Sequence, residues 1–248
     1  MKKVLAAFMI ALLVFTGCKN QKFTLYIYGD ESGYYTEADA ELPVYTGHRA
    51  YDSIAVGKRS VSFNGKEYEG TFFGSEYDYL SGCRADVYDF TGGHFAVDAG
   101  NGKLLRISFV LPQTGKPIDI GEAKSRCDIL AAEYADISGW KKEAARGELG
   151  YVFDYTYIID GELTAQNIEI CTDRQGNVIS FVYTAQDMFD GSEQVPNVKG
   201  AARKLGKMSG GIVDQKVLIK LPDGQMGVLY SITAQGETTP FKYLAVQG

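Results

Sequence analysis

The chain has 248 residues, of which 45% are hydrophobic and 23% charged, and its formal net charge is −6. This composition is that of an ordinary globular protein, and the length suits one large domain or two or three small ones. The acidic balance disfavours nucleic acid, whose phosphates require a basic protein face, and it disfavours attachment to anionic lipid by charge alone.

The first stretch, MKKVLAAFMIALLVFTGC, has two lysines followed by an uncharged apolar run from Val4 to Phe15. The run is too short to cross a membrane as a helix, which needs about 20 residues, and it fits a secretory signal peptide. Its end, Phe15-Thr16-Gly17-Cys18, resembles the lipobox of bacterial lipoproteins. The resemblance implies cleavage before Cys18, acylation of Cys18 with palmitate-type chains, and anchoring at the cell membrane on its extracytoplasmic side. The alternative is an ordinary secreted protein in which Cys18 has no such role.

The chain beyond this leader divides into regions of different pattern. We expect residues 1–17 to be the signal peptide and residues 18–22 a lipidated tether. Residues 23–111 form a β-rich N-terminal region that ends in a meander. Residues 112–190 contain a helix followed by a second meander, and residues 191–248 form a shorter unit of the same kind.

The N-terminal region contains several short strands. The alternation of bulky residues predicts a strand over residues 23–28, and Asn64-Gly65 predicts a two-residue hairpin turn, because both residues tolerate positive φ. Strands over residues 86–90, 94–98 and 103–111, joined by Gly-containing turns, predict an antiparallel meander.

The clearest helix is predicted from about residue 120 to about residue 135. Asp119 and Glu122 have the spacing of a capping box, in which each side chain accepts from a free amide of the first turn. Apolar residues then recur at helical spacing, which places them on one face: Ala123, Cys127, Leu130, Ala131 and Tyr134.

The same order of elements returns further along the chain. After the helix, three strands form a second meander, and a short helix over residues 197–205 precedes a third. The predicted strands of these two meanders are 149–160, 164–172, 177–184, 212–221, 225–233 and 240–246. Because a three-stranded sheet has one apolar face that a helix can cover, the expected fold class is α+β. We expect tandem units of one helix packed on an antiparallel three-stranded sheet, β-rich overall.

The unit from Ile120 to Thr184 resembles a PepSY-type domain, in which one helix lies on an antiparallel sheet. Residues 197–248 resemble a shorter relative, so the two together cover about half of the chain beyond the leader. The resemblance rests on the order of elements, the capped helix and the Gly turn. It implies a non-catalytic binding, inhibitory or chaperone-like part and transfers no catalytic residues.

Three cysteines follow the leader: Cys83, Cys127 and Cys171. They form no C-x-x-C pair, so neither a zinc site nor a redox motif is indicated. We expect three buried thiols, since a free cysteine packs like a small hydrophobic residue. A Cys127–Cys171 disulfide is the alternative.

Catalytic motifs are absent from the sequence. The two histidines, His48 and His94, lie in no H-E-x-x-H sequence, and no G-x-S-x-G sequence occurs. The stretch Ser81-Gly82-Cys83-Arg84 is similar to the Ser-x-Gly-Cys-x-Arg setting of L,D-transpeptidases, in which a histidine activates the cysteine. It lacks one residue between Ser and Gly and one between Cys and Arg, and His48 is not followed by Gly.

Two further patterns have structural interpretations. The row Tyr151, Phe153, Tyr155 and Tyr157 could stack on a carbohydrate, but the polar residues between them favour a core under the helix. The stretch from Asp98 to Asn101 lacks the alternating carboxylates of a calcium loop and predicts a hairpin turn.

The function expected from the sequence is a lipid-anchored extracytoplasmic binding or regulatory module that is not an enzyme. We expect no cofactor, no metal and no nucleic acid, with an envelope protein or the cell wall as partner. One alternative is an envelope hydrolase or transpeptidase that uses Cys83. Another is a mainly structural surface protein.

Overall fold

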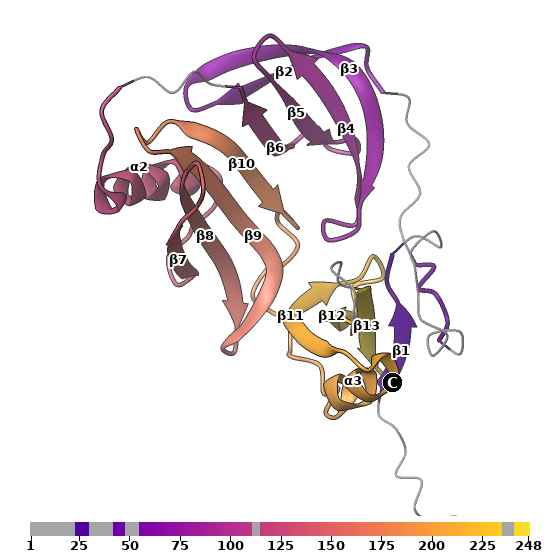
Figure 1. Cartoon of the computed structure of the whole chain (residues 1–248). Helices are drawn as coiled ribbons and strands as arrows, with labels where there is room; N and C mark the ends of the chain where they lie inside the picture. Colours follow the sequence, from indigo (N-terminus) through magenta and orange to yellow (C-terminus); the bar gives the residue numbers. More distant parts are fainter. Residues whose placement is uncertain (1–22, 30–41, 48–54, 111–114, 235–240) are drawn as a thin grey trace, which may run out of the picture.

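The computed structural model describes residues 23–29, 42–47, 55–110, 115–234 and 241–248. Two helices accompany thirteen strands in this part of the chain (Figure 1). The helices are α2 (Ile120–Ala132) and α3 (Ala201–Ser209). The strands are β1 (Phe23–Ile27), β2 (Lys58–Phe63), β3 (Lys66–Asp78), β4 (Cys83–Phe90), β5 (Gly93–Asp98), β6 (Leu104–Phe109), β7 (Lys141–Arg146), β8 (Gly150–Ile159), β9 (Glu162–Asp173), β10 (Val178–Thr184), β11 (Ile212–Lys220), β12 (Met226–Thr233) and β13 (Phe241–Gln247).

All thirteen strands belong to one sheet. Its path runs β1-β13-β12-β11-β9-β10-β6-β5-β4-β3-β2, and β8 and β7 branch from β9. The pairing is antiparallel except between β9 and β11, which meet in parallel at Thr164 and Leu218. Figure 1 shows the strands in three groups: β2–β6 at the top, β7–β10 with α2 at the left, and β11–β13 with β1 and α3 at the lower right.

The predicted fold class of tandem helix-on-three-stranded-sheet units is wrong, although the β-rich character is confirmed. The meanders do not end as separate sheets, because strands of one group pair with strands of another. β6 pairs with β10, where Ile107 lies opposite Phe181, and β9 pairs with β11, where Thr164 lies opposite Leu218. Free strand edges carry unpaired amides and carbonyls, and this pairing satisfies them. Among the described residues no helix precedes α2, and the first meander was predicted without one.

The strand β7 is not among the strands predicted from the sequence, which place no element between the helix and residue 149. Its residues, KKEAAR, are all exposed and show no alternation of apolar and polar side chains. It is held by pairing with β8, from Lys141 opposite Thr156 to Arg146 opposite Tyr151. β8 and β9 therefore belong to a four-stranded group rather than to a meander of three.

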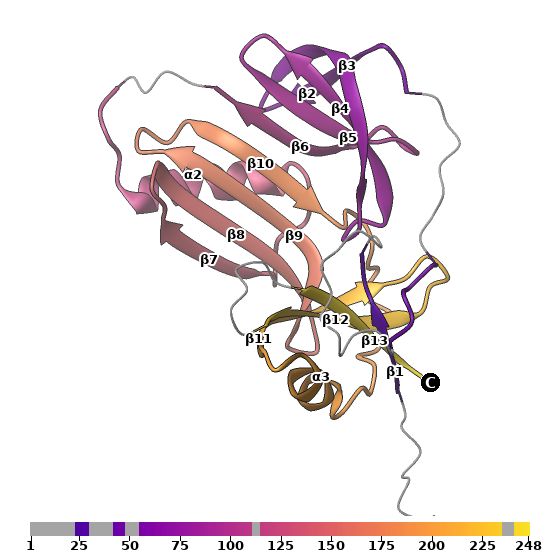
Figure 2. The ribbon, with the colours of Figure 1, turned by 45° about the vertical axis from the view of Figure 1, so that its right-hand side comes forward.

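The helix α2 begins and packs as its sequence predicts. The Asp119 carboxylate accepts hydrogen bonds from the amides of Gly121 (2.7 Å) and Glu122 (3.1 Å), which otherwise lack partners at the helix start. The Glu122 carboxylate accepts instead from Arg126 at 2.6 Å. The helix buries its apolar stripe against the sheet, and Figure 2 shows it behind β8, β9 and β10.

One aromatic core joins the first two groups of strands. The ring of Phe181 in β10 lies 5.3 Å from that of Phe63 in β2 and 4.6 Å from that of Tyr134, just after α2. Phe153 and Tyr155 of β8 are buried in the same core, which confirms that the row of aromatic residues on β8 packs under the helix. The domain boundary expected at residues 111 and 112 stays a prediction, although this core draws residues from both sides of it.

The last group of strands is covered on both faces. On one face, α3 buries Ala201 and Leu205 against β11–β13 and β1. This helix begins four residues later than predicted, because Gly200 adopts a positive φ of 95° and the regular helix starts after it. Within the described part of the chain, neither α2 nor α3 is long and apolar enough to cross a membrane.

The opposite face of this last group contacts the turn between β3 and β4. Tyr79 and Leu80 of that turn pack against a cluster that includes Tyr28 and Leu244. The hydroxyl of Tyr28 donates to the carbonyl of Tyr79 at 2.8 Å. The turn thus connects the first group of strands to the last.

Candidate binding groove

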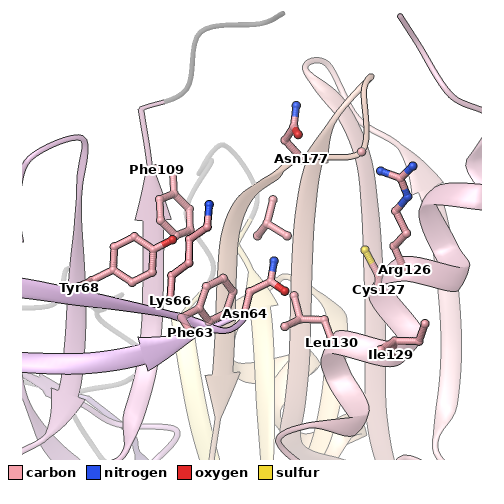
Figure 3. Close-up of a pocket in the computed structure, with 12 residues that line it drawn as sticks. Phe63, Asn64, Lys66, Tyr68, Phe109, Arg126, Cys127, Ile129, Leu130 and Asn177 are labelled. Atoms are coloured by element: carbon pink, nitrogen blue, oxygen red, sulfur yellow. The ribbon is translucent and has the colours of Figure 1, made fainter. Parts of the chain in front are cut away.

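A groove of about 610 Å³ opens between the β2–β3 hairpin, the end of β6, α2 and the β9–β10 turn. Its volume lies in the range of ligand pockets, about 300–1,000 Å³. Figure 3 shows aromatic side chains of the hairpin and β6 on one side and α2 on the other. The lining residues are Phe63, Asn64, Lys66, Tyr68, Phe109, Arg126, Cys127, Ile129, Leu130, Gly176, Asn177 and Val178.

The hairpin wall is positioned by the predicted Asn-Gly turn. Asn64 and Gly65 have φ values of 49° and 71°, as a turn with two left-handed residues requires. The turn places Phe63 at the end of β2 and Lys66 at the start of β3. Phe63 is buried while Asn64 and Lys66 are exposed, so the hairpin gives the groove an apolar floor and a polar edge.

An aromatic cluster forms the floor on this side. The ring of Phe109 lies 5.4 Å from that of Tyr68 and 5.8 Å from that of Phe63. Partial burial raises the pKa of the Tyr68 hydroxyl. These rings offer flat apolar surface together with one hydroxyl group.

The wall formed by α2 is mainly aliphatic. Leu130 and Cys127 are buried, whereas Ile129 is 68% exposed. Burial, followed by the nearby Asp128 carboxylate, raises the pKa of the Cys127 thiol to about 12. Since a thiol nucleophile must be deprotonated, Cys127 acts here as a packing group.

The charged residues that line the groove are both cations. Arg126 of α2 donates from Nη2 to Glu122, and a Cβ atom at Gly176 in the β9–β10 turn would lie 3.5 Å from its Nη1 atom. Lys66 makes no ion pair with any residue that the structure describes. Among the described residues that line the groove there is no carboxylate, although that of Glu122 pairs with Arg126 beside it. An edge with Lys66 and Arg126 therefore contrasts with the net negative charge of the whole chain.

The stretch around Cys83 has a structural role in the fold. The Ser81 hydroxyl donates to Asp78 at 2.7 Å and accepts from the amide of Ala185 at 2.8 Å. Cys83 is only 2% exposed and packs against Ala85 and other small apolar residues of β4–β6. These contacts hold the β3–β4 turn against the end of β10.

The described histidine is too far from Cys83 to activate it. His94 lies opposite Asp89, which is six residues along β4 from Cys83, or roughly 20 Å at about 3.3 Å per residue. His48 lies outside the described residues. Nothing in the described geometry therefore favours Cys83 as a nucleophile. Absence of catalytic residues stays a prediction.

The structure also describes the Asp98–Asn101 turn and the residues that could bind a metal ion. The Asp98 carboxylate accepts from the Gly100 amide at 2.6 Å and from Asn101 at 3.1 Å, so it stabilises its own hairpin turn, as predicted. In the described part of the chain, no group of three or more His, Cys, Asp or Glu residues could hold a metal ion. The expectation of no metal stays a prediction.

The cysteines beyond the leader are free thiols. Cys83 and Cys127 are buried, as expected, and Cys171 is half-buried. Cys171 follows Ile170, whose side chain lies in the core with Cys127. Because successive side chains of a strand point to opposite faces, the sheet separates the two sulfur atoms. The lipidation site predicted at Cys18 lies outside the described residues.

The polar edge of the groove was not predicted from the sequence. Only the Asn64-Gly65 turn and the buried stripe of α2 were predicted, and neither indicates that Lys66 and Arg126 share one groove. The two residues are far apart in the chain and come together because β6 pairs with β10.

Comparisons with known proteins give little further guidance. No known protein family matches the chain, and no curated protein matches it either. The structure is similar to that of the Bacillus megaterium YpeB C-terminal domain, with a TM-score of 0.36 and 11% sequence identity, over 98% of this chain and 97% of that one. A TM-score of this size does not establish a shared fold.

Proposed function

We propose that the protein is a lipid-anchored module on the extracytoplasmic side of the cell membrane, and that it binds another envelope protein through the groove beside α2. The leader ending in Cys18 motivates the location. The order of helix and strands in residues 120–184, which resembles PepSY-type domains, is in keeping with a non-catalytic role.

One observation supports the binding role most directly. The groove exposes a large aliphatic side chain, Ile129, and is also lined by aromatic rings and by the polar side chains of Asn64 and Lys66. Exposed apolar surface rimmed by polar groups is typical of interaction sites. Cys83 lines a smaller cavity of about 350 Å³, but its side chain is only 2% exposed and no described histidine is within reach of its thiol. A binding function is therefore better supported than a hydrolase or transpeptidase.

Site-specific photo-crosslinking in intact cells tests the binding role. We would place benzoylphenylalanine at position 129 and, as a matched control, at position 212, because Ile212 is 75% exposed but lies in β11, away from the groove. We expect one identified envelope protein to crosslink from position 129 and not from position 212. Equal recovery from both positions, or none from position 129, would contradict the proposal.

The anchoring is tested separately. The Cys18→Ala variant should lose incorporation of an alkyne-labelled fatty acid and should leave the membrane fraction, whereas Cys83→Ala should retain both. A labelled Cys18→Ala protein would show that the lipid is attached elsewhere or that the leader has another role.

A further inference from the structure

We infer that the groove binds a peptide segment of its partner in which acidic side chains alternate with aliphatic or aromatic ones. This inference rests on the proposed binding function and adds the chemistry of the bound segment. It is argued from the charges, the apolar walls and the hydrogen-bonding groups of the groove.

The charged side chains that line the groove favour an anionic ligand. Lys66 stands on one side and Arg126 on the other, and no carboxylate is among the lining residues. Lys66 has no ion-pair partner among the described residues, so its charge is available to a ligand. Arg126 uses only Nη2 to bind Glu122. Its remaining donors can bind a carboxylate, for which the planar guanidinium is well suited.

The apolar walls require more than an anion. Ile129 exposes most of its side chain, and the partly exposed rings of Tyr68 and Phe109, which pack together above the buried Phe63, form an aromatic floor. Burying such surface contributes about 25 cal/mol per Å² to binding. A purely anionic ligand would leave this surface in water. The groove therefore suits a segment that presents carboxylates to the edge and apolar side chains to the floor.

A protein segment fits better than a membrane surface. Two cations contribute only about 1 kcal/mol each to binding an anionic bilayer. The chain as a whole carries a net charge of −6, so an extended anionic surface would repel it outside the groove. A narrow peptide meets only the cationic edge. Asn64 adds an exposed amide there, which can bond to a peptide backbone.

The test uses synthetic peptides and the full chain purified in detergent. The probe is a fluorescent decapeptide of alternating Glu and Leu, and binding is measured by fluorescence anisotropy. Decapeptides of alternating Lys and Leu and of alternating Glu and Ser serve as controls for charge and for apolar contacts. We expect saturable binding of the Glu-Leu peptide, at least tenfold weaker binding of both controls, and weakening by salt.

Charge reversal at the groove identifies the site. Lys66→Glu and Arg126→Glu should each weaken binding of the Glu-Leu peptide at least tenfold, and the double variant should gain affinity for the Lys-Leu peptide. The matched control is Lys207→Glu, which reverses an exposed lysine of α3 and should change nothing. Circular dichroism of each variant shows whether it is folded.

Several outcomes would overturn the inference. These are no saturable binding of the Glu-Leu peptide, equal affinity for the Lys-Leu peptide, or tighter binding to vesicles containing phosphatidylglycerol than to any peptide. Failure here is distinguishable from failure of the proposed function. If position 129 still crosslinks to an identified protein in cells, and charge reversal leaves that crosslink intact, only the acidic character of the segment is wrong.

Discussion

The hydroxyl of Tyr155 in β8 donates a hydrogen bond of 2.9 Å to the Asp128 carboxylate of α2. The same carboxylate accepts from Lys124, one helical turn earlier, at 2.7 and 2.9 Å. Partial burial alone would raise the pKa of Asp128, but the hydrogen bonds from Lys124 and Tyr155 outweigh it and hold the pKa below its ordinary value. Asp128 therefore fastens the helix to the sheet while it stays ionised.

This contact predicts a loss of stability in alkali. Burial, and then the hydrogen bond to Asp128, raise the pKa of Tyr155 above its ordinary value of 10.0. Above about pH 10 the unfolded chain loses this proton while the folded protein keeps it, so the free energy of unfolding falls as pH rises. Urea unfolding at pH 8 and pH 11 should show this fall. Tyr155→Phe should be about 1 kcal/mol less stable at pH 8 and should show a smaller fall.

The variant Asp128→Asn tests the same contact at acidic pH, where the stability of the folded protein is compared with that of the unaltered chain. Because the folded pKa of Asp128 is depressed, its contribution is present above the ordinary carboxyl pKa and is lost as pH falls through the folded value. The Asn variant should therefore show less loss of stability in acid than the unaltered protein. Identical acid profiles for the two proteins would argue against the ion pair as a source of stability.

Close approach of two strands predicts a sharp difference between two glycine substitutions. A Cβ atom at Gly150 of β8 would lie 2.1 Å from the carbonyl oxygen of Thr172, whereas one at Gly74 of β3 would meet nothing within 4 Å. Gly150→Ala should lower the free energy of unfolding by about 2 kcal/mol, because backbone must move to admit the methyl group. Gly74→Ala, the matched strand control, should be neutral or slightly stabilising. Chemical unfolding of both variants measures the difference.

The shared aromatic core predicts one unfolding transition for the strands on both sides of residues 111–114. Phe181 is fully buried between Phe63 and Tyr134, so Phe181→Ala should lower the free energy of unfolding by about 3–5 kcal/mol. Phe73→Ala, in which a 74% exposed side chain is removed, should change it by less than about 0.5 kcal/mol. Near-ultraviolet circular dichroism follows the aromatic core during urea unfolding.

A fragment of residues 112–190 tests whether this region can fold without the aromatic residues of the first group of strands. Residues 112–190 alone lack Phe63, Phe95 and Ile107, which complete the core around α2. The fragment should therefore not give a cooperative transition. Cooperative unfolding of the fragment at the stability of the full chain would support the predicted domain boundary instead.

The thiols of Cys83, Cys127 and Cys171 should react more slowly in the folded protein than in the unfolded chain. Cys83 and Cys127 are buried. Burial is also the main cause that raises the pKa values of Cys127 and Cys171. In a Cys18→Ala protein, a disulfide-exchange reagent at pH 8 should react slowly with the folded chain and quickly with three thiols in urea. One rapidly reacting thiol in urea, rising to three after reduction, would indicate a disulfide.

Local patterns in the sequence predicted the individual elements well. Asn64-Gly65 specifies its turn through backbone conformations that few other residues adopt, and Asp119 caps α2 through amides only two and three residues away. Such features depend on neighbours in the chain and can be predicted from it. β7 could not, because KKEAAR has no apolar face and becomes a strand only by pairing with β8.

The assembly of these elements depends on contacts between distant residues. β6 could have been the edge of a separate meander, but its pairing with β10, in which Ile107 lies opposite Phe181, joins the two groups into one sheet. The groove follows from that pairing, because it brings the wall with Lys66 to the wall with Arg126. Which distant strands pair, and in which register, is not visible in any local sequence pattern. For this reason the predicted tandem-unit arrangement was wrong, and the polar edge of the groove was not predicted.

The pairing of β1 with β13 sets an order for maturation. Residues 23–27, nearest to any attachment at the amino-terminal end, lie against residues 243–247, the last strand of the chain. Of the described strands, β1 is synthesised first and β13 last, so β1 can form this pairing only after β13 has been made. A product that stops before β13 would leave the edge of β1 that faces β13 unpaired, and this exposed strand edge would be open to proteolysis.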